Sequence, residues 1–240
     1  MAILRLDKFL TAMGAGSRSD VKKLIKAKKV AVDGEMVFKP EIKINTDINT
    51  VTLDGEELKY IEYVYYMLNK PQGVVSATTD DLSVTVVDLI KEGNKKKLFP
   101  VGRLDKDTEG LLLITNDGEL AHNLLSPKKH VNKKYYVELD GMLTDKMADI
   151  ISKGVKLEEG FTTLPAVIEK TTDPRKVYIT IQEGKFHQVK RMFNYVGLNV
   201  VFLKRISMGP LVLDEKLTKG SYRELTQDEL DKLNKVTKTS

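Results

Sequence analysis

The sequence has 240 residues and a net charge of +5, from 39 Lys and Arg against 34 Asp and Glu. It has no Cys, which excludes a disulfide scaffold, a thiolate zinc site and a cysteine nucleophile, and its three His argue against a His-based metal site. Apolar runs all fall short of the ~18 residues that span a bilayer, so we expect a cytoplasmic protein.

The positive charge is concentrated in the first 30 residues, which carry eight Lys or Arg against two acids. Apolar spacing predicts a helix over residues 4–13 and a second over residues 20–27, which Ser17 or Ser19 can cap. Short alternating strands then flank Asp-Gly pairs at 33–34 and 54–55, the pattern of tight hairpins. This segment is therefore predicted to fold as two short helices followed by small strands.

Basic side chains on one side of these helices suit phosphate binding, although a solvated lysine face explains them equally well. The pattern R-L-D-K-F-L…S-R-S-D…V-x-V-D-G resembles the small RNA-binding domain named after a small-subunit ribosomal protein, over about residues 3–58. The resemblance implies RNA binding. The residues that would contact RNA are Arg5, Lys8, Arg18, Lys22, Lys23 and Lys26.

We predict an RNA-binding domain over residues 1–59, a linker over 60–63 and a larger domain over 64–240. Periodicity and turn signals in the larger domain predict five strands, over residues 65–68, 111–115, 134–139, 177–181 and 200–203. They also predict five helices, over residues 84–90, 119–125, 145–151, 186–195 and 226–233. Because strands and helices do not alternate regularly, the predicted fold class is α+β, with a mixed, largely antiparallel sheet.

An acid-rich, glycine-flanked loop precedes the apolar strand at 111–115. It holds Asp105, Asp107 and Glu109, and loops supported by rigid strands often carry catalytic groups. Spacing alone does not choose among the three acids. A solvated loop or a weak cation site would have the same pattern.

The segment G-R-L-D-x-D-T-x-G-L-L-L-x-T-N-D-G at 102–118 resembles the catalytic motif of the pseudouridine synthases, in their RsuA-like branch. Four further segments match that family in the same order along the chain. They are M-L-N-K-P-Q-G at 67–73, K-Y-Y-V at 134–137, G-K-F-H-Q-V-K-R-M at 184–192, and Leu203-x-Arg205 ahead of Gly209. The resemblance thus covers nearly the whole chain.

The resemblance implies a role for each of five residues. Asp105 corresponds to the catalytic aspartate, and Lys190 to the basic residue that pairs with it. Tyr135 corresponds to the tyrosine that stacks on the target base and manages the proton at C5. Arg103 lines the cleft, and Leu203 packs under the base. Because the reaction only moves a base from its N1 to its C5 attachment, the resemblance implies neither cofactor nor metal.

Taken singly, these residues have plainer interpretations. A tyrosine on a strand usually packs, a lysine on a helix is usually surface charge, and His187 is interpreted as structural. Asp107 is expected to point away from Asp105, two residues earlier in the loop. Only the joint match to the family favours the catalytic roles.

The expected substrate is one uridine of small-subunit (16S) ribosomal RNA, and the expected partner is that RNA, without a membrane and with the protein as a monomer. A uridine of large-subunit (23S) RNA is the first alternative. A non-catalytic RNA-binding or assembly factor is the second. A hydrolase of glycosidic bonds is the third, and it needs a second carboxylate near Asp105.

Overall fold

The computed structural model describes residues 3–91, 98–157 and 160–238. The chain folds into two compact units, with the boundary between Tyr63 and Val64. The outer limits predicted for the two domains, residues 1 and 240, lie outside the described residues. Among the described helices, none has the length and apolar character needed to cross a membrane.

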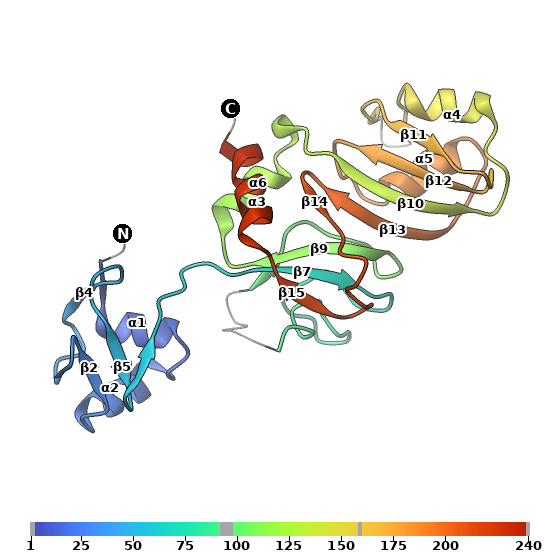
Figure 1. Cartoon of the computed structure of the whole chain (residues 1–240). Helices are drawn as coiled ribbons and strands as arrows, with labels where there is room; N and C mark the ends of the chain where they lie inside the picture. Colours follow the sequence, from blue (N-terminus) through green and yellow to red (C-terminus); the bar gives the residue numbers. More distant parts are fainter. Residues whose placement is uncertain (1–2, 92–97, 158–159, 239–240) are drawn as a thin grey trace. The chain divides into compact units, whose positions relative to one another are not determined.

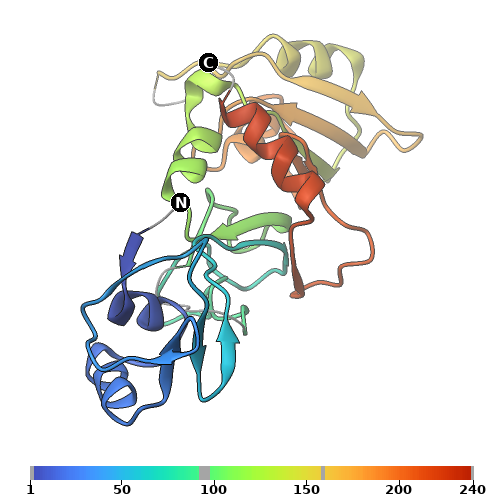
Figure 2. The ribbon, with the colours of Figure 1, turned by 60° about the vertical axis from the view of Figure 1, so that its left-hand side comes forward.

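The N-terminal unit contains two helices and six short strands among its described residues (Figures 1 and 2). They are β1 (Ile3–Arg5), α1 (Leu6–Ala12), α2 (Arg18–Lys26), β2 (Val30–Val32), β3 (Glu35–Met36), β4 (Lys43–Asn45), β5 (Val51–Leu53) and β6 (Glu56–Leu58). Strand β1 pairs with β4, and the other four form a sheet in the order β3-β2-β5-β6. Helix α1 begins two residues later than predicted, because Leu4 pairs with Ile44 in the β1–β4 ladder.

Local chemistry explains the ends of these elements. Ser17 caps α2 in a reciprocal capping box with Asp20, which settles the choice between the two serines. Asp33 and Gly34 both have positive φ, as the tight hairpin between β2 and β3 requires. The apolar faces of both helices pack with buried strand residues such as Val30 into one small core.

The larger unit is built on a nine-stranded sheet within the described residues (Figure 1). Its strands are β7 (Tyr65–Lys70), β8 (Phe99–Pro100), β9 (Glu109–Thr115), β10 (Lys133–Leu139), β11 (Val167–Lys170), β12 (Lys176–Ile181), β13 (Val200–Met208), β14 (Leu211–Val212) and β15 (Tyr222–Glu224). The main order is β11-β12-β10-β13-β9-β7-β15, with β14 beside β13 and β8 beside β9. Neighbouring strands are antiparallel except β9 and β13, which confirms the predicted mixed, largely antiparallel sheet.

Helices cover both faces of this sheet. They are α3 (Gly118–Leu125), α4 (Asp145–Ser152), α5 (Gln188–Tyr195) and α6 (Gln227–Lys238), with a short 3-10 helix, η2 (Pro127–Lys129). Helices α3 and α6 lie side by side over one face, and α4 and α5 contribute to the core on the other (Figures 1 and 2). Strand β9 is buried along its whole length, because its alternate residues enter the two cores.

The parallel pair β9–β13 depends on a glycine. Gly110 lies opposite Arg205, and a Cβ built on Gly110 would lie 2.2 Å from the Arg205 carbonyl oxygen. Gly110 also has a φ of +102°, which side chains rarely adopt. The backbones of β9 and β13 can approach this closely because the residue has no side chain.

Two predicted helices are corrected by the structure. Residues 84–90 form turns instead of a helix: Val75 and Thr85 bridge in parallel, and the Thr85 side chain hydrogen-bonds with Asp88. The apolar residues of this segment, such as Val86 and Ile90, are buried in the core and not on one helical face. The helix predicted over 186–195 begins only at Gln188, because the residue before it is left-handed.

Candidate active site

The acid-rich loop between β8 and β9 sends its three carboxylates into three different environments. Asp105 faces a pocket, whereas Asp107 binds a lysine of helix α5. Glu109 is buried at the start of β9, and its Oε1 accepts a hydrogen bond from Lys219 at 2.9 Å. The fold therefore distinguishes acids that sequence spacing could not: Asp105 lines this pocket, whereas Asp107 lines only an adjoining cavity, which it shares with Asp105, His187 and Lys190.

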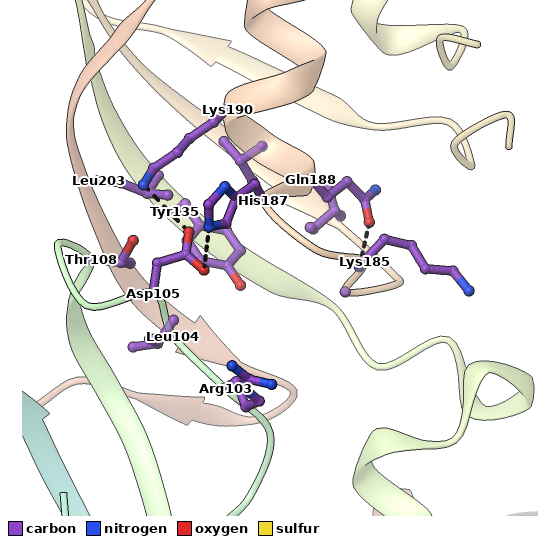
Figure 3. A pocket seen from close by; sticks show the side chains of 13 residues that line it. Arg103, Leu104, Asp105, Thr108, Tyr135, Lys185, His187, Gln188, Lys190 and Leu203 are labelled. Atoms are coloured by element: carbon purple, nitrogen blue, oxygen red, sulfur yellow. Dashed lines mark hydrogen bonds and ion pairs between the residues drawn. The ribbon is translucent and has the colours of Figure 1, made fainter. Parts of the chain in front are cut away.

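The pocket gathers residues from four separate parts of the chain (Figure 3). The loop before β9 contributes Arg103, Leu104, Asp105 and Thr108, and the sheet contributes Tyr135 from β10 and Leu203 from β13. Helix α5 and the turn before it contribute Lys185, His187 and Lys190. All five residues named above as catalytic or substrate-binding line this one pocket: Arg103, Asp105, Tyr135, Lys190 and Leu203. Arg103 and Leu203 thus line the same pocket although a hundred positions separate them in the sequence.

The floor of the pocket is formed by neighbouring strands. Tyr135 lies opposite Arg205 in the β10–β13 ladder, one pleat from Leu203, with an irregularity in the ladder just before Tyr135. Tyr135 is 7% exposed and Leu203 is 5% exposed. An aromatic ring and an aliphatic side chain beside the carboxylate form an apolar surface suited to a flat ring.

Lys190 contacts both aspartates of the loop. Its Nζ lies 3.4 Å from Asp105 Oδ2, but 2.6 and 2.8 Å from the two carboxylate oxygens of Asp107. The prediction that Asp107 points away is therefore wrong, because one ammonium draws the two carboxylates to the same side. The hydrogen bond from Lys190 lowers the pKa of Asp107. Asp107 is thus held as an anion and is poorly suited to protonate a leaving group, as the hydrolase alternative would need.

His187 belongs to the pocket, which sequence reasoning missed. Its Nε2 lies 3.6 Å from Asp105 Oδ1, and Figure 3 shows the ring directed at that carboxylate. The residue has a φ of +49°, in the left-handed region that non-glycine residues adopt sparingly. Helical periodicity carries no sign of such a turn. The only available signal was the position of His187 inside the G-K-F-H-Q-V-K-R-M match.

The loop that carries Asp105 is anchored from below by Lys70, a second residue that the sequence did not single out. Lys70 is completely buried, and its Nζ donates to the carbonyl oxygens of Pro71, Asp105 and Thr108 at 2.9–3.0 Å. Burial lowers the pKa of Lys70 to about 8. This ammonium thus organises the backbone on which the pocket carboxylate is mounted.

Thr108 provides one more polar group that the sequence did not single out. It lines the pocket, is 1% exposed, and its Oγ1 has no hydrogen-bond partner among the described residues. A buried hydroxyl without a partner is costly, so Thr108 is an energetically unfavourable feature of the loop that carries Asp105.

The basic residues named for RNA binding are all exposed in the N-terminal unit, but they are not equally available. The Arg5 guanidinium donates two hydrogen bonds to Asp7, at 3.1 and 2.8 Å. Lys23 lies 3.8 Å from Asp20. The remaining exposed residues of the set are Lys8, Arg18, Lys22 and Lys26.

In chemical terms, the pocket offers a carboxylate, a neighbouring cation and an apolar floor. No group of three or more His, Asp and Glu in the described part of the chain is placed to hold a metal ion. Such a pocket can bind a flat, uncharged ring and bring one carboxylate to its attached sugar.

Comparison with known proteins identifies the class. Residues 64–195 match the family described as RNA pseudouridylate synthase, and residues 4–47 match the S4 domain. The chain belongs to the RNA pseudouridine synthase family, and it is therefore an isomerase that carries an N-terminal S4 domain.

Individual relatives resemble the chain over almost its whole length. An uncharacterized RNA pseudouridine synthase of Bacillus subtilis, YtzG, is 50% identical and covers 96% of this chain and 98% of its own. The ribosomal small subunit pseudouridine synthase A of Escherichia coli is 42% identical over 95% of this chain and 98% of its own. A crystal structure of a pseudouridylate synthase aligns with a TM-score of 0.68 at 40% identity, covering 96% of this chain and 99% of the other.

Proposed function

We propose that this protein converts one specific uridine of small-subunit (16S) ribosomal RNA into pseudouridine, with Asp105 as the catalytic carboxylate. The observation that carries the proposal is the meeting of Arg103, Asp105, Tyr135, Lys190 and Leu203 in one pocket, although they come from distant parts of the chain. The likeness to small-subunit synthases, at 42% identity over nearly all of both chains, supports the choice of RNA.

Asp105 acts on the sugar of the target uridine. Its carboxylate either attacks C1′ as the N1–C1′ bond breaks or removes the proton from C2′ to give a glycal. The base then turns and C5 bonds to C1′ as the bond to Asp105 breaks or the proton returns to C2′. C5 then loses its proton and N1 carries one in its place, so no atom enters or leaves overall. Lys190 places a positive charge 3.4 Å from the Asp105 carboxylate and so offsets part of the negative charge that Asp105 and Asp107 bring together.

Tyr135 and Leu203 receive the base once it has left the RNA stack. Extruding a nucleotide costs a few kcal/mol, and stacking on an aromatic side chain returns about 1–3 kcal/mol per base. Tyr135 is also proposed to manage the proton at C5, and Arg103 to hold the nucleotide at the rim. The pocket residues that we assign to the chemistry are therefore Asp105, Tyr135 and Lys190.

RNA docking is assigned to the N-terminal unit. Lys8, Arg18, Lys22, Lys23 and Lys26 are proposed to contact phosphates, which position the RNA without reading its sequence. Arg5 is proposed to join them only by exchanging its Asp7 partner for a phosphate. We further propose that the protein acts as a cytoplasmic monomer on ribosomal RNA, alone or in an assembly particle.

The test is modification of unmodified 16S and 23S transcripts in vitro, with pseudouridine mapped by carbodiimide treatment and primer extension. Wild type is run beside Asp105→Ala. Asp149→Asn, which removes an exposed carboxylate of α4 outside the pocket, serves as the control. One new stop in the 16S transcript that Asp105→Ala abolishes and Asp149→Asn retains supports the whole proposal.

The other outcomes separate the alternatives. A stop in the 23S transcript keeps the chemistry and changes the target. Release of free uracil identifies a hydrolase. RNA binding without any stop, in transcripts and in small-subunit assembly particles alike, identifies a non-catalytic factor. Modification by Asp105→Ala at the wild-type rate would refute the assigned catalytic residue.

A further inference from the structure

A pair of stacked rings leads from the pocket to the surface. The ring centroids of Phe186 and His187 are 3.8 Å apart, with only 18° between the ring planes. His187 Nε2 is 3.6 Å from Asp105 Oδ1, whereas Phe186 is 70% exposed. The two rings therefore form a stacked pair, in which His187 contacts the proposed catalytic carboxylate and Phe186 faces solvent.

A left-handed residue in the backbone allows the two rings to stack. His187 has a φ of +49°, so the helical conformation of α5 starts only at the next residue. A regular helix through these positions would separate consecutive side chains by about 100° and prevent parallel stacking. The left-handed turn at His187 thus accompanies the placement of both rings together at the pocket.

Exposure of one phenylalanine carries no argument by itself, because scattered apolar side chains are normal on protein surfaces. Phe186 differs from a scattered residue in its stacking on a pocket residue and in the charges around it. Lys185 directly precedes it in the chain with its Nζ 5.0 Å over the Phe161 ring, and Arg191 Nη1 donates to the Phe186 carbonyl oxygen at 3.4 Å. An aromatic ring among cations is the combination that binds single-stranded nucleic acid.

We infer that Phe186, stacked on His187, is a subsite for an RNA base next to the uridine that enters the pocket. This inference rests on the proposed function, since it assigns a neighbour of the same substrate. When the uridine is extruded, its neighbour loses a stacking partner, and the Phe186 ring replaces it. Because every base has a π-face, the subsite accepts any of the four bases and contributes affinity rather than sequence choice.

The first test uses the absence of tryptophan from the sequence. Phe186→Trp makes a protein with one tryptophan at the subsite. Tyr195→Trp places one at the C-terminal end of helix α5, which follows the subsite, at a residue that is 55% exposed. Both are titrated with the unmodified 16S transcript, with binding confirmed by gel shift at the same concentrations. We expect base stacking to quench the fluorescence of Phe186→Trp and to leave Tyr195→Trp nearly unchanged.

The second test is kinetic and uses a synthetic RNA fragment around the uridine that the mapping assay identifies. Phe186→Leu is expected to raise KM about tenfold to hundredfold, with kcat much less affected, because stacking on the ring is lost. Phe186→Tyr keeps a ring and is expected to retain the wild-type KM. In a fragment with an abasic site beside the uridine, wild type and Phe186→Leu are expected to have the same KM.

The two tests can fail separately. Equal fluorescence responses from Phe186→Trp and Tyr195→Trp on bound RNA overturn the subsite, even if pseudouridine forms normally. A full KM penalty for Phe186→Leu on the abasic fragment also overturns it, because the loss then has a structural origin. Quenching at residue 186 without pseudouridine in any RNA would instead keep the subsite and reject the proposed reaction.

Discussion

Replacing Lys70 by methionine tests how the loop of Asp105 is held. Methionine has a similar length and leaves little cavity, but it removes the ammonium that donates to three carbonyl oxygens at 2.9–3.0 Å. The Asp105 oxygen keeps the Thr108 N–H as a donor, whereas the Pro71 and Thr108 oxygens lose theirs at about 1–2 kcal/mol each, which makes ~3 kcal/mol in all. Removing a buried charge returns part of this loss, so we expect the free energy of unfolding to fall by ~2 kcal/mol.

Urea unfolding of Lys70→Met measures this change, and Lys106→Met is the matched control. Lys106 is the exposed lysine of the same loop, and its Nζ donates to Ser83 Oγ at 3.2 Å. We expect the control to lie within ~0.5 kcal/mol of wild type. The loosened loop also displaces the Asp105 carboxylate, so kcat is expected to fall about a hundredfold. Wild-type stability and kcat in Lys70→Met would refute the anchoring role.

The pH profile adds a second readout for Lys70. Burial lowers its pKa in the folded chain to about 8, from the ordinary value of 10.5. Between these pH values the unfolded chain binds more protons than the folded chain, so the free energy of unfolding rises with pH through this window. Below pH 8 both states are protonated and the contribution is flat. In Lys70→Met this part of the rise is expected to disappear.

Three further predictions follow from the fold and the charges. Gly110→Ala places a Cβ 2.2 Å from a backbone oxygen of β13 at a positive φ, so we expect the free energy of unfolding in urea to fall by more than ~3 kcal/mol. Gly118→Ala has open space around its Cβ and is expected to be tolerated. Burial and neighbouring positive charge lower the pKa of Lys133 to about 8. From about pH 8 to pH 10.5 the free energy of unfolding of wild type is therefore expected to rise relative to that of Lys133→Met. Parallel pH profiles of the two proteins would disprove this. If Lys22 and Lys26 bind phosphates, replacing both by alanine is expected to reduce the slope of log affinity against log salt by about two, and an unchanged slope in filter binding would exclude them.

The sequence by itself determined the elements and the family. Periodicity found most helices and strands because the alternation of apolar residues reflects which face is buried. It failed at residues 84–90, where Val86 and Ile90 are buried in a turn, since a turn packed into the core has the same apolar content as a short helix. The motifs named five residues that meet in the pocket, because their types and order match the family.

Only the tertiary structure decided how the groups of the pocket face one another. Lys190 draws Asp105 and Asp107 to one side, His187 turns to Asp105 through a left-handed residue, and Lys70 lies beneath the loop. Each of these contacts joins segments that are distant in the chain, from 35 residues between Lys70 and Asp105 to 85 between Asp105 and Lys190. Sequence patterns record the local environment of a residue, whereas the direction of a side chain depends on which distant partner the fold brings to it.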